Sequence, residues 1–184
     1  LFLECLDSPQ RAGLVHAFFA ERETARAPET RSAKPRPINS IGVVGGGTMG
    51  AGIAVAVLDA GLPVTMIERD DEALARGRKH VDKVYDGLIA KGRITPDVKD
   101  ATMARLNGST SYDALAQADL VIEAVFEDMA VKHAVFAELD RVCKPGAVLA
   151  TNTSYLDIDE IAAAISHPQD VVGLHFFSPA NIMK

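Results

Sequence analysis

A glycine-rich segment, Gly45-Gly46-Gly47-Thr48-Met49-Gly50, has the spacing G-x-G-x-x-G and stands between a predicted strand and a predicted helix. In such a position Gly45 permits a tight turn, Gly47 lets the backbone approach a pyrophosphate, and Gly50 lets the helix pack closely on the strand. Backbone N–H groups at the helix N-terminus can then hold the anion. The segment therefore predicts a turn that binds the phosphates of a dinucleotide. It lacks the G-K-[ST] ending of an ATP- or GTP-binding loop.

An acidic residue, Glu68, ends the second predicted strand, roughly 20 residues after Gly47. A carboxylate at this point accepts hydrogen bonds from the ribose hydroxyls and repels a 2′-phosphate, so it favours NAD over NADP. The neighbouring Arg69 is the competing feature, because its charge would suit the phosphate. The alternative interpretation of Glu68 is a solvated acid at a strand end.

Polar residues follow the later strands too, and ligands of open parallel sheets bind at the carboxyl ends of the strands. Glu127 follows one strand, and Lys132 lies one turn into the next helix. From position alone, this pair is equally typical of a ligand site and of a surface acid and base at a helix start. Asn152-Thr153-Ser154 follows another strand, where its amide and hydroxyl groups could hydrogen-bond a substrate oxygen. Helix capping is the alternative, because Ser154 or Asp157 could begin the next helix.

A histidine, His175, follows the last apolar run of the chain. A lone histidine among apolar residues is more often a structural residue of the core. Oxidation of a secondary alcohol with NAD, however, needs a base for the hydroxyl proton, and imidazole is the side chain best suited to proton transfer near neutral pH. His175 is therefore the candidate general base. The other histidines show no metal-ligand spacing, and we expect no metal site.

The elements that must position these residues alternate between strand and helix from Ile38 onward. Apolar strands are predicted at 38–44, 64–67, 118–125, 147–151 and 171–177, and helices at 48–60, 128–142 and 158–165. An apolar stripe from Leu74 to Leu88, a break at Gly92 and a second helix start around Thr95-Pro96 predict a helical hairpin. Strands that are apolar throughout and separated by helices predict an α/β fold, a doubly wound and mostly parallel sheet covered on both faces.

Upstream of this domain, Ser8-Pro9 is a helix start, and apolar residues then recur at helical spacing. The following segment is rich in proline and basic residues and almost free of apolar ones, which predicts an extended linker. We therefore divide the chain into a linker helix at 1–23, an extended linker at 24–37 and a domain at 38–184.

Composition excludes several classes of function. Nearly half of the 184 residues are apolar, at 48%, so the chain can bury a core, and the net charge of −6 with scattered Lys and Arg argues against nucleic acid as a partner. No apolar run approaches the roughly 20 residues of a membrane span. Two cysteines without CxxC spacing indicate no disulfide framework.

Four ordered segments of the chain closely resemble the NAD-binding domain of 3-hydroxyacyl-CoA dehydrogenases. They are Val43–Ala54 (VVGGGTMGAGIA), Asp119–Glu127 (DLVIEAVFE), Asn152-Thr153-Ser154 and Gly173–Pro179 (GLHFFSP). Upstream, Ala17–Arg22 (AFFAER) resembles the linker helix that follows an enoyl-CoA hydratase domain in multifunctional β-oxidation enzymes. Cys143-Lys144-Pro145 and Leu156–Ala162 (LDIDEIA) are similar to segments of peroxisomal bifunctional enzymes and of the alpha subunits of bacterial fatty oxidation complexes.

The resemblance implies a Rossmann-like fold and NAD-dependent oxidation of (S)-3-hydroxyacyl-CoA to 3-oxoacyl-CoA in fatty-acid β-oxidation. By matched position, His175 is the general base and Ser154 hydrogen-bonds the reacting 3-oxygen. Lys91 on the helical hairpin matches a lysine that meets the CoA. The NAD site implied in the same way consists of Gly45, Gly47, Met49 through its backbone, Gly50, Glu68, Val125, Glu127, Lys132, Ser154 and Ser178. Ser178 departs from the Asn common in monofunctional members.

The resemblance also implies partners: the 3-hydroxyacyl-CoA substrate, an adjoining hydratase domain and a helical C-terminal dehydrogenase domain. The acid that partners the catalytic histidine in the family would fall just beyond Lys184. We therefore expect the isolated chain to bind NAD but to be inactive. The expected location is cytoplasmic if the protein is bacterial and peroxisomal if it is eukaryotic.

Two alternatives remain. Other Rossmann dehydrogenases, of the 3-hydroxyisobutyrate or 6-phosphogluconate type, share the glycine-rich opening but are expected to lack Gly173–Pro179 as written. A non-catalytic NAD-binding relative, comparable to the crystallin members of the family, would be distinguished by a turnover assay.

Overall fold

The computed structural model describes residues 2–24 and 32–183, and the chain divides into two compact units, Leu1–Arg36 and Pro37–Lys184. The first unit contains α1 (Phe2–Leu6) and α2 (Pro9–Thr24). The Ser-Pro start of α2 has its expected geometry, since Ser8 Oγ accepts the Arg11 N–H over 3.2 Å. The range 1–23, predicted as one linker helix, thus contains two helices that are separated at Asp7 and Ser8. Of the predicted extended linker, residues 25–31 lie outside the described residues, and residues 33–37 form neither helix nor strand.

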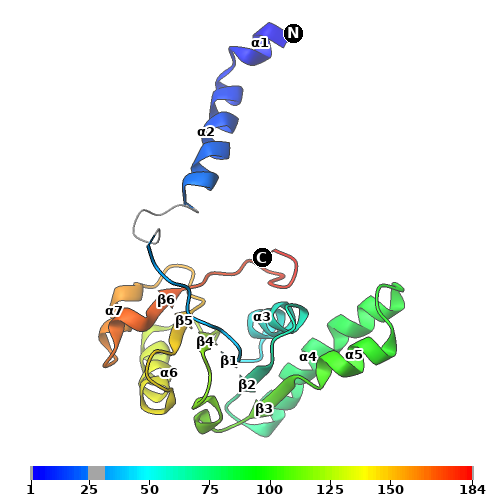
Figure 1. Ribbon diagram of the computed structural model, residues 1–184, viewed down its shortest axis with the longest axis vertical. Coiled ribbons are helices and arrows are strands. Elements are labelled where there is room, and N and C mark those ends of the chain that lie inside the picture. The colour runs from blue at the N-terminus through cyan, green and yellow to red at the C-terminus, as the bar shows by residue number, and fades with distance from the viewer. Residues whose placement is uncertain (1, 25–31, 184) are drawn as a thin grey trace. The chain divides into compact units, whose positions relative to one another are not determined.

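The second unit is a six-stranded sheet with helices on both faces (Figure 1). Its strands are β1 (Ile41–Val44), β2 (Val64–Ile67), β3 (Leu106–Ser109), β4 (Leu120–Glu123), β5 (Val148–Thr151) and β6 (Val171–Gly173). All five pairings are parallel, in the order β3-β2-β1-β4-β5-β6. The predicted doubly wound fold is thus confirmed. The strand order reverses between β1 and β4, and a crevice at the carboxyl ends of these strands is where such sheets bind ligands.

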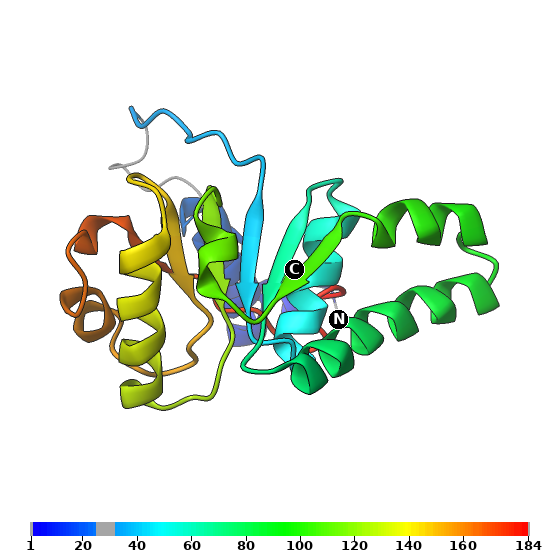
Figure 2. The same ribbon diagram turned by 90° about the horizontal axis from the view of Figure 1, so that it is seen from below.

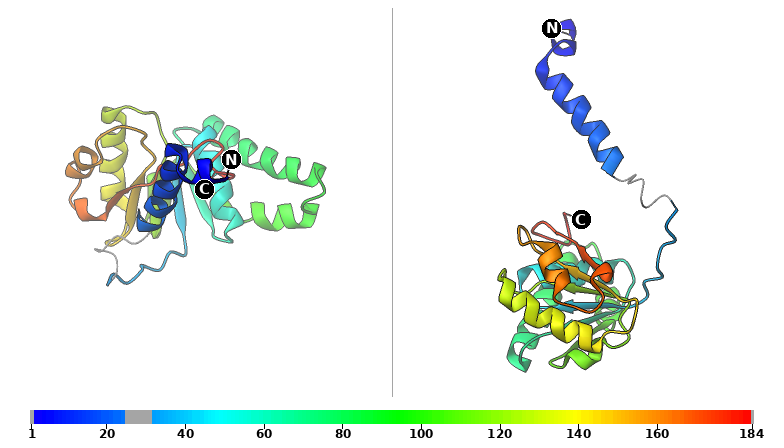
Figure 3. Two further views of the ribbon diagram at one scale, coloured as in Figure 1. Left: turned by 90° about the horizontal axis from the view of Figure 1, so that it is seen from above. Right: turned by 90° about the vertical axis from the view of Figure 1, so that its left-hand side faces the viewer.

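The helices separate into two groups around the sheet (Figures 1 and 2). The first group is α3 (Thr48–Asp59), α4 (Asp71–Ala90) and α5 (Pro96–Met103), and the second is α6 (Met129–Val142) and α7 (Ile158–Ala163), with the short 3₁₀ helices η2 (Tyr112–Leu115) and η3 (Pro168–Asp170). The right-hand view of Figure 3 looks onto the side formed by α6 and α7. The predicted helical hairpin is α4 and α5, which extends past the edge strand β3 (Figure 2).

Successive side chains of each strand point to opposite faces of the sheet, and they form two separate cores. Val43 and Met66 join the cluster beneath α3, whereas the next residues of the same strands, Val44 and Ile67, join the cluster beneath α6. This alternation follows from the period of two in a strand. On β4 it places Glu123 on the same face as Val121, toward α6, and the register sets Glu123 beside Thr151 of β5.

The edge strand β3 is missing from the sequence prediction. Only Leu106 of its four residues is buried, and Asn107 and Gly108 interrupt any apolar pattern, so the pairing with β2 is a tertiary effect. The predicted strand at 38–44 begins late for a similar reason: the Asn39 and Ser40 N–H groups donate to the Asp119 carboxylate instead of to a neighbouring strand. Within the described part of the chain, no helix has the length and apolar character that crossing a membrane requires.

Candidate functional site

The glycine turn between β1 and α3 leaves space where a ligand could approach its backbone. Gly45 has φ +94°, in the left-handed region, and a Cβ on Gly50 would lie 1.7 Å from the Gly45 carbonyl oxygen. Both positions therefore require glycine for the turn itself. Around Gly47, in contrast, no described residue other than its chain neighbours lies within 4 Å of an added Cβ, and none of the described side chains caps α3 at this residue. The turn thus presents open backbone at a helix N-terminus, which fits a pyrophosphate.

Two further glycines have a function that the sequence analysis missed. Gly46 and Gly77 approach so closely that an added Cβ on either would lie 3.0 Å from the Cα of the other. An added Cβ on Gly46 would also lie 2.7 Å from the Met66 sulfur. Helix α4 therefore crosses directly against the turn. A glycine inside an otherwise regular helical stripe was the available signal for this contact.

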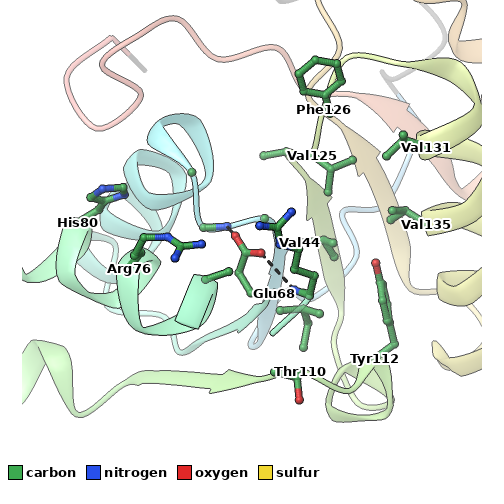
Figure 4. A pocket seen from close by; sticks show the side chains of 17 residues that line it. Val44, Glu68, Arg76, His80, Thr110, Tyr112, Val125, Phe126, Val131 and Val135 are labelled. Atoms are coloured by element: carbon green, nitrogen blue, oxygen red, sulfur yellow. Dashed lines mark hydrogen bonds between the residues drawn. The ribbon is translucent and has the colours of Figure 1, made fainter. Parts of the chain in front are cut away.

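Glu68 lies beside the turn at the end of β2. Its Oε1 accepts the Gly46 N–H over 2.7 Å, and its Oε2 accepts the Arg69 N–H over 3.2 Å (Figure 4). The competing residue Arg69 turns its guanidinium to Asp70, with 3.1 Å between Nε and Oδ2. Of the two charged side chains at the end of β2, the Glu68 carboxylate is therefore the one that is hydrogen-bonded to the turn.

A cavity of about 670 Å³ opens beside Glu68 and the turn. Arg76 and His80 of α4 line one side, and Val131 and Val135 of α6 lie on the other (Figure 4). Burial raises the pKa of Tyr112, a further wall residue, and the charges of nearby glutamates add to this rise, so its hydroxyl stays neutral. Such a mostly apolar slot with a few polar groups suits an adenosine.

The predicted NAD residues are only partly brought together by this cavity. Four of them line it: Gly45, Gly47, Glu68 and Val125. The remaining six do not: Met49, Gly50, Glu127, Lys132, Ser154 and Ser178. The sequence analysis did not predict four other residues of the cavity wall, because one face of α4 and the unpredicted region around β3 supply them. These residues are Arg76, His80, Thr110 and Tyr112.

Ser154 and His175 form a second cluster, at the ends of β5 and β6. Ser154 Oγ lies 3.1 Å from His175 Nε2, within hydrogen-bonding distance, and both residues are exposed. The exposure of His175 rules out the interpretation as a buried core histidine. The capping interpretation of Ser154 fails as well, because Asp157 caps α7 by accepting the Asp159 N–H over 2.9 Å.

Glu127 holds the segment that carries Ser154. Its Oε1 accepts the Thr153 hydroxyl over 2.6 Å and the Ser154 N–H over 2.7 Å. Burial alone would raise the pKa of Glu127, but these two hydrogen bonds and the charge of Lys132 outweigh it and lower the pKa below its ordinary value. Glu127 is therefore an anion at neutral pH.

Lys132 is buried rather than presented to a ligand. Its Nζ lies 2.8 and 2.9 Å from the two carboxylate oxygens of Glu123 and 3.3 Å from Glu127 Oε2. Glu123 was missed by the sequence analysis. The signal for it was an acid in the middle of the apolar run DLVIEAVFE, where a charge must be paired.

The other predicted residues lie apart from these clusters. Lys91 is exposed and caps the C-terminal end of α4 in the hairpin, and Ser178 is exposed ahead of a cis peptide bond to Pro179. Asn152 Oδ1 accepts the Phe176 N–H over 2.8 Å and so joins the end of β5 to the segment after β6. Among the residues that the structure describes, no group of three or more His, Cys, Asp or Glu is placed to hold a metal.

Residues 40–184 match the family model described as 3-hydroxyacyl-CoA dehydrogenase, NAD binding domain. The peroxisomal bifunctional enzyme of Cavia porcellus is 44% identical over 189 residues, covering 100% of this chain and 26% of that protein. The fatty acid oxidation complex subunit alpha of Shewanella frigidimarina is 37% identical over 183 residues, covering 99% of this chain and 26% of that protein. The chain thus spans about a quarter of the length of these curated relatives.

Solved structures resemble this chain as well. The 3-hydroxybutyryl-CoA dehydrogenase of Escherichia coli superposes with a TM-score of 0.77 at 42% identity, covering 81% of this chain and 32% of that one. FadB2 of M. tuberculosis superposes with a TM-score of 0.77 at 44% identity, covering 79% of this chain and 51% of that one.

Proposed function

Because the chain belongs to the family of NAD-binding domains of 3-hydroxyacyl-CoA dehydrogenases, we propose that it supplies the cofactor site and the proton-transfer residues for oxidation of (S)-3-hydroxyacyl-CoA to 3-oxoacyl-CoA in fatty-acid β-oxidation. The observation that carries this proposal is the Ser154–His175 pair, 3.1 Å apart at the carboxyl ends of β5 and β6. Family membership also decides between the dehydrogenase types that remained open from the sequence.

Two features of the chain fit an NAD molecule. The open backbone at Gly47 forms the N-terminus of α3, where N–H groups can bind the pyrophosphate. Glu68 lies beside the 670 Å³ cavity that suits the adenosine. NAD, when bound, supplies the acceptor for the hydrogen and electron pair that leave the hydroxyl-bearing carbon. We assign Met49, Gly50, Val125, Glu127, Ser154 and Ser178 to the same cofactor site by their family positions. Lys132, placed in the NAD site by the same resemblance, supports that site from the interior, because its buried ammonium contacts Glu123 and Glu127.

The proton of the substrate hydroxyl goes to His175. A hydroxyl oxygen within hydrogen-bonding distance of both Ser154 Oγ and His175 Nε2 can donate its proton to Nε2 while Ser154 hydrogen-bonds the oxygen. The O–H and C–H bonds break as the C=O bond forms, and the carbonyl oxygen stays hydrogen-bonded to Ser154. The anionic Glu127 holds the Ser154 N–H and thereby the position of the serine.

The natural protein, in this proposal, continues on both sides of the chain. An enoyl-CoA hydratase domain precedes it and a helical dehydrogenase domain follows it, in keeping with relatives named as bifunctional or multifunctional enzymes of which the chain spans 26%. Lys91 on the hairpin contacts the CoA. The compartment is the peroxisome for a eukaryotic source and the cytoplasm for a bacterial one.

Turnover by the full-length natural protein tests the assignment. NADH absorbance is followed with 3-hydroxybutyryl-CoA and NAD for the wild type and for His175→Ala. Loss of a general base is expected to lower kcat by ~10²- to 10⁴-fold. Wild-type turnover in the His175→Ala variant would remove His175 from this function, and a wild type without turnover would favour the non-catalytic, crystallin-like alternative.

A further inference from the structure

A buried ion pair lies beneath the proposed catalytic pair. The side chains of Glu123 and Lys132 are 0% and 1% exposed, and Nζ contacts both carboxylate oxygens, at 2.8 and 2.9 Å. The same oxygens accept the Val125 N–H over 2.7 Å and the Thr151 hydroxyl over 2.7 Å. Glu123 therefore has a hydrogen-bond donor from the segment after β4, from α6 and from β5.

Stability is a poor explanation for this pair. Removing two charges from water carries a large desolvation cost, and a well-packed apolar pair of similar volume often holds two elements together equally well or better. Val135, Phe136 and Leu139 of α6 are buried in an apolar cluster on the same side of the sheet. The function of the pair must then lie in what the lysine reaches next.

The next contact of Lys132 leads to the site. Its Nζ lies 3.3 Å from Glu127 Oε2, and the other oxygen of Glu127 accepts the Thr153 hydroxyl and the Ser154 N–H. Ser154 Oγ in turn lies 3.1 Å from His175 Nε2. One unbroken path of polar contacts thus joins the interior of β4 to the exposed pair.

We infer that Glu123 is a positioning residue for the oxidation, an inference that rests on the proposed function. By binding Lys132 from the interior, Glu123 keeps the ammonium group in place, so that Glu127 can use one oxygen for the lysine and the other for Thr153 and Ser154. Without the Glu123 charge, Lys132 has Glu127 as its remaining carboxylate partner. The buried ammonium then draws Glu127 away from the segment of Ser154, and the spacing of Ser154 and His175 is lost.

The variant that tests this is Glu123→Gln, which keeps the volume and removes the charge. The matched control is Tyr85→Phe, because Tyr85 is also buried and its hydroxyl contacts Asp59 Oδ1 at 3.0 Å, in the α3–α4 region away from the pair. Both variants of the full-length protein are assayed with 3-hydroxybutyryl-CoA and NAD, well below their unfolding midpoints. If Glu123→Gln does not fold, Thr151→Val replaces it, since it removes one hydrogen bond to Glu123 and keeps both charges.

We expect Glu123→Gln to lower kcat by ~10- to 100-fold, the cost typical of small displacements of catalytic groups, with KM for the acyl-CoA within about threefold. Thr151→Val should lower kcat in the same direction by a smaller factor, and Tyr85→Phe should keep kcat within about twofold. Wild-type kcat in a folded Glu123→Gln or Thr151→Val variant overturns the inference. An equal loss of kcat in Tyr85→Phe overturns it as well, because general destabilisation would then explain the result.

A second readout does not depend on the proposed function. In the 184-residue chain, the Ser154 N–H donates to a carboxylate over 2.7 Å, so its amide proton should resonate downfield in the NMR spectrum. Glu123→Gln should move this resonance upfield and broaden or shift the ring protons of His175, while Tyr85→Phe leaves both in place. An unchanged Ser154 amide in Glu123→Gln overturns the positioning path even if turnover is absent. A shifted amide together with an inactive wild type would instead overturn the proposed function alone.

Discussion

Glu68 illustrates, at the scale of the residue, how one carboxylate can serve both the fold and the ligand. Its Oε1 binds the Gly46 N–H and so ties the end of β2 to the phosphate turn, while the side chain borders the cavity. A ribose hydroxyl can donate to such a carboxylate, and a 2′-phosphate is repelled by it. Arg69 also lines the cavity, but its guanidinium is paired with Asp70.

We therefore predict that the 184-residue chain binds NADH more tightly than NADPH, and that Glu68→Ala weakens NADH binding by about 1–3 kcal/mol through the loss of charged hydrogen bonds. Calorimetry with both cofactors measures the preference. Asp97→Ala is the control, because it removes a negative charge from the exposed start of α5, outside the cavity. Equal affinity for the two cofactors would mean that Arg69 governs the site instead.

At the scale of the element, the start of β1 depends on one residue of a neighbouring segment. Asp119, just before β4, accepts the Asn39 and Ser40 N–H groups over 2.7 and 3.1 Å, and Lys144 binds its other oxygen. The hydrogen bond from Lys144, followed by that from Asn39, lowers the pKa of Asp119 to about 2. This carboxylate fixes the chain where it enters the sheet, beside the strands that carry the site.

The pH dependence follows from the sign of that shift. Because the folded-state pKa lies below the ordinary value, the contribution of Asp119 is complete above about pH 4 and is lost as the pH falls toward 2. Asp119→Asn should unfold at lower denaturant concentration than the wild type at pH 5 and above, and the difference should shrink between pH 4 and about 2. Urea titrations at several pH values measure it. A difference that stays constant across this range would show that Asp119 does not act through its charge.

The whole molecule presents its proposed catalytic pair to solvent. Ser154 and His175 are exposed, and the large apolar side chains Phe126, Tyr155 and Phe177 are exposed in the segments that follow β4, β5 and β6. Among the described residues, the hydrogen-bond partner of His175 is Ser154. A base without a second partner to fix its ring, in a site open to water, lacks both orientation and desolvation.

We accordingly predict that the 184-residue chain binds NADH yet has dehydrogenase activity several orders of magnitude below that of the full-length protein, because such losses combine. NADH absorbance with 3-hydroxybutyryl-CoA, at equal concentrations of the two proteins, provides the comparison. Calorimetry with NADH on the same sample shows whether the chain is folded. Turnover by the chain close to that of the full-length protein would refute the prediction.

Local patterns in the sequence were sufficient for five of the six strands, for the helices between them and for the phosphate turn. The spacing of Gly45, Gly47 and Gly50 predicts the turn because each glycine answers a constraint of the immediate backbone. Apolar residues that recur with a period of 2 or of 3.6 residues likewise predict most strands and helices, since burial of one face requires apolar residues at regularly spaced positions. The parallel pairing then follows from the alternation of the elements.

Only the tertiary structure decided what lies between distant segments. Strand β3 forms because β2 offers a free edge to a segment with little apolar pattern, and Gly46 meets Gly77 because α4 crosses the turn. The path from Glu123 through Lys132 and Glu127 to Ser154 joins two strand ends and one helix. Its members carry a recognisable residue type but no local spacing that specifies their partners. The register of β4 and β5 and the placement of α6 determine which buried charged groups contact one another. Register and placement depend in turn on the packing of the whole sheet.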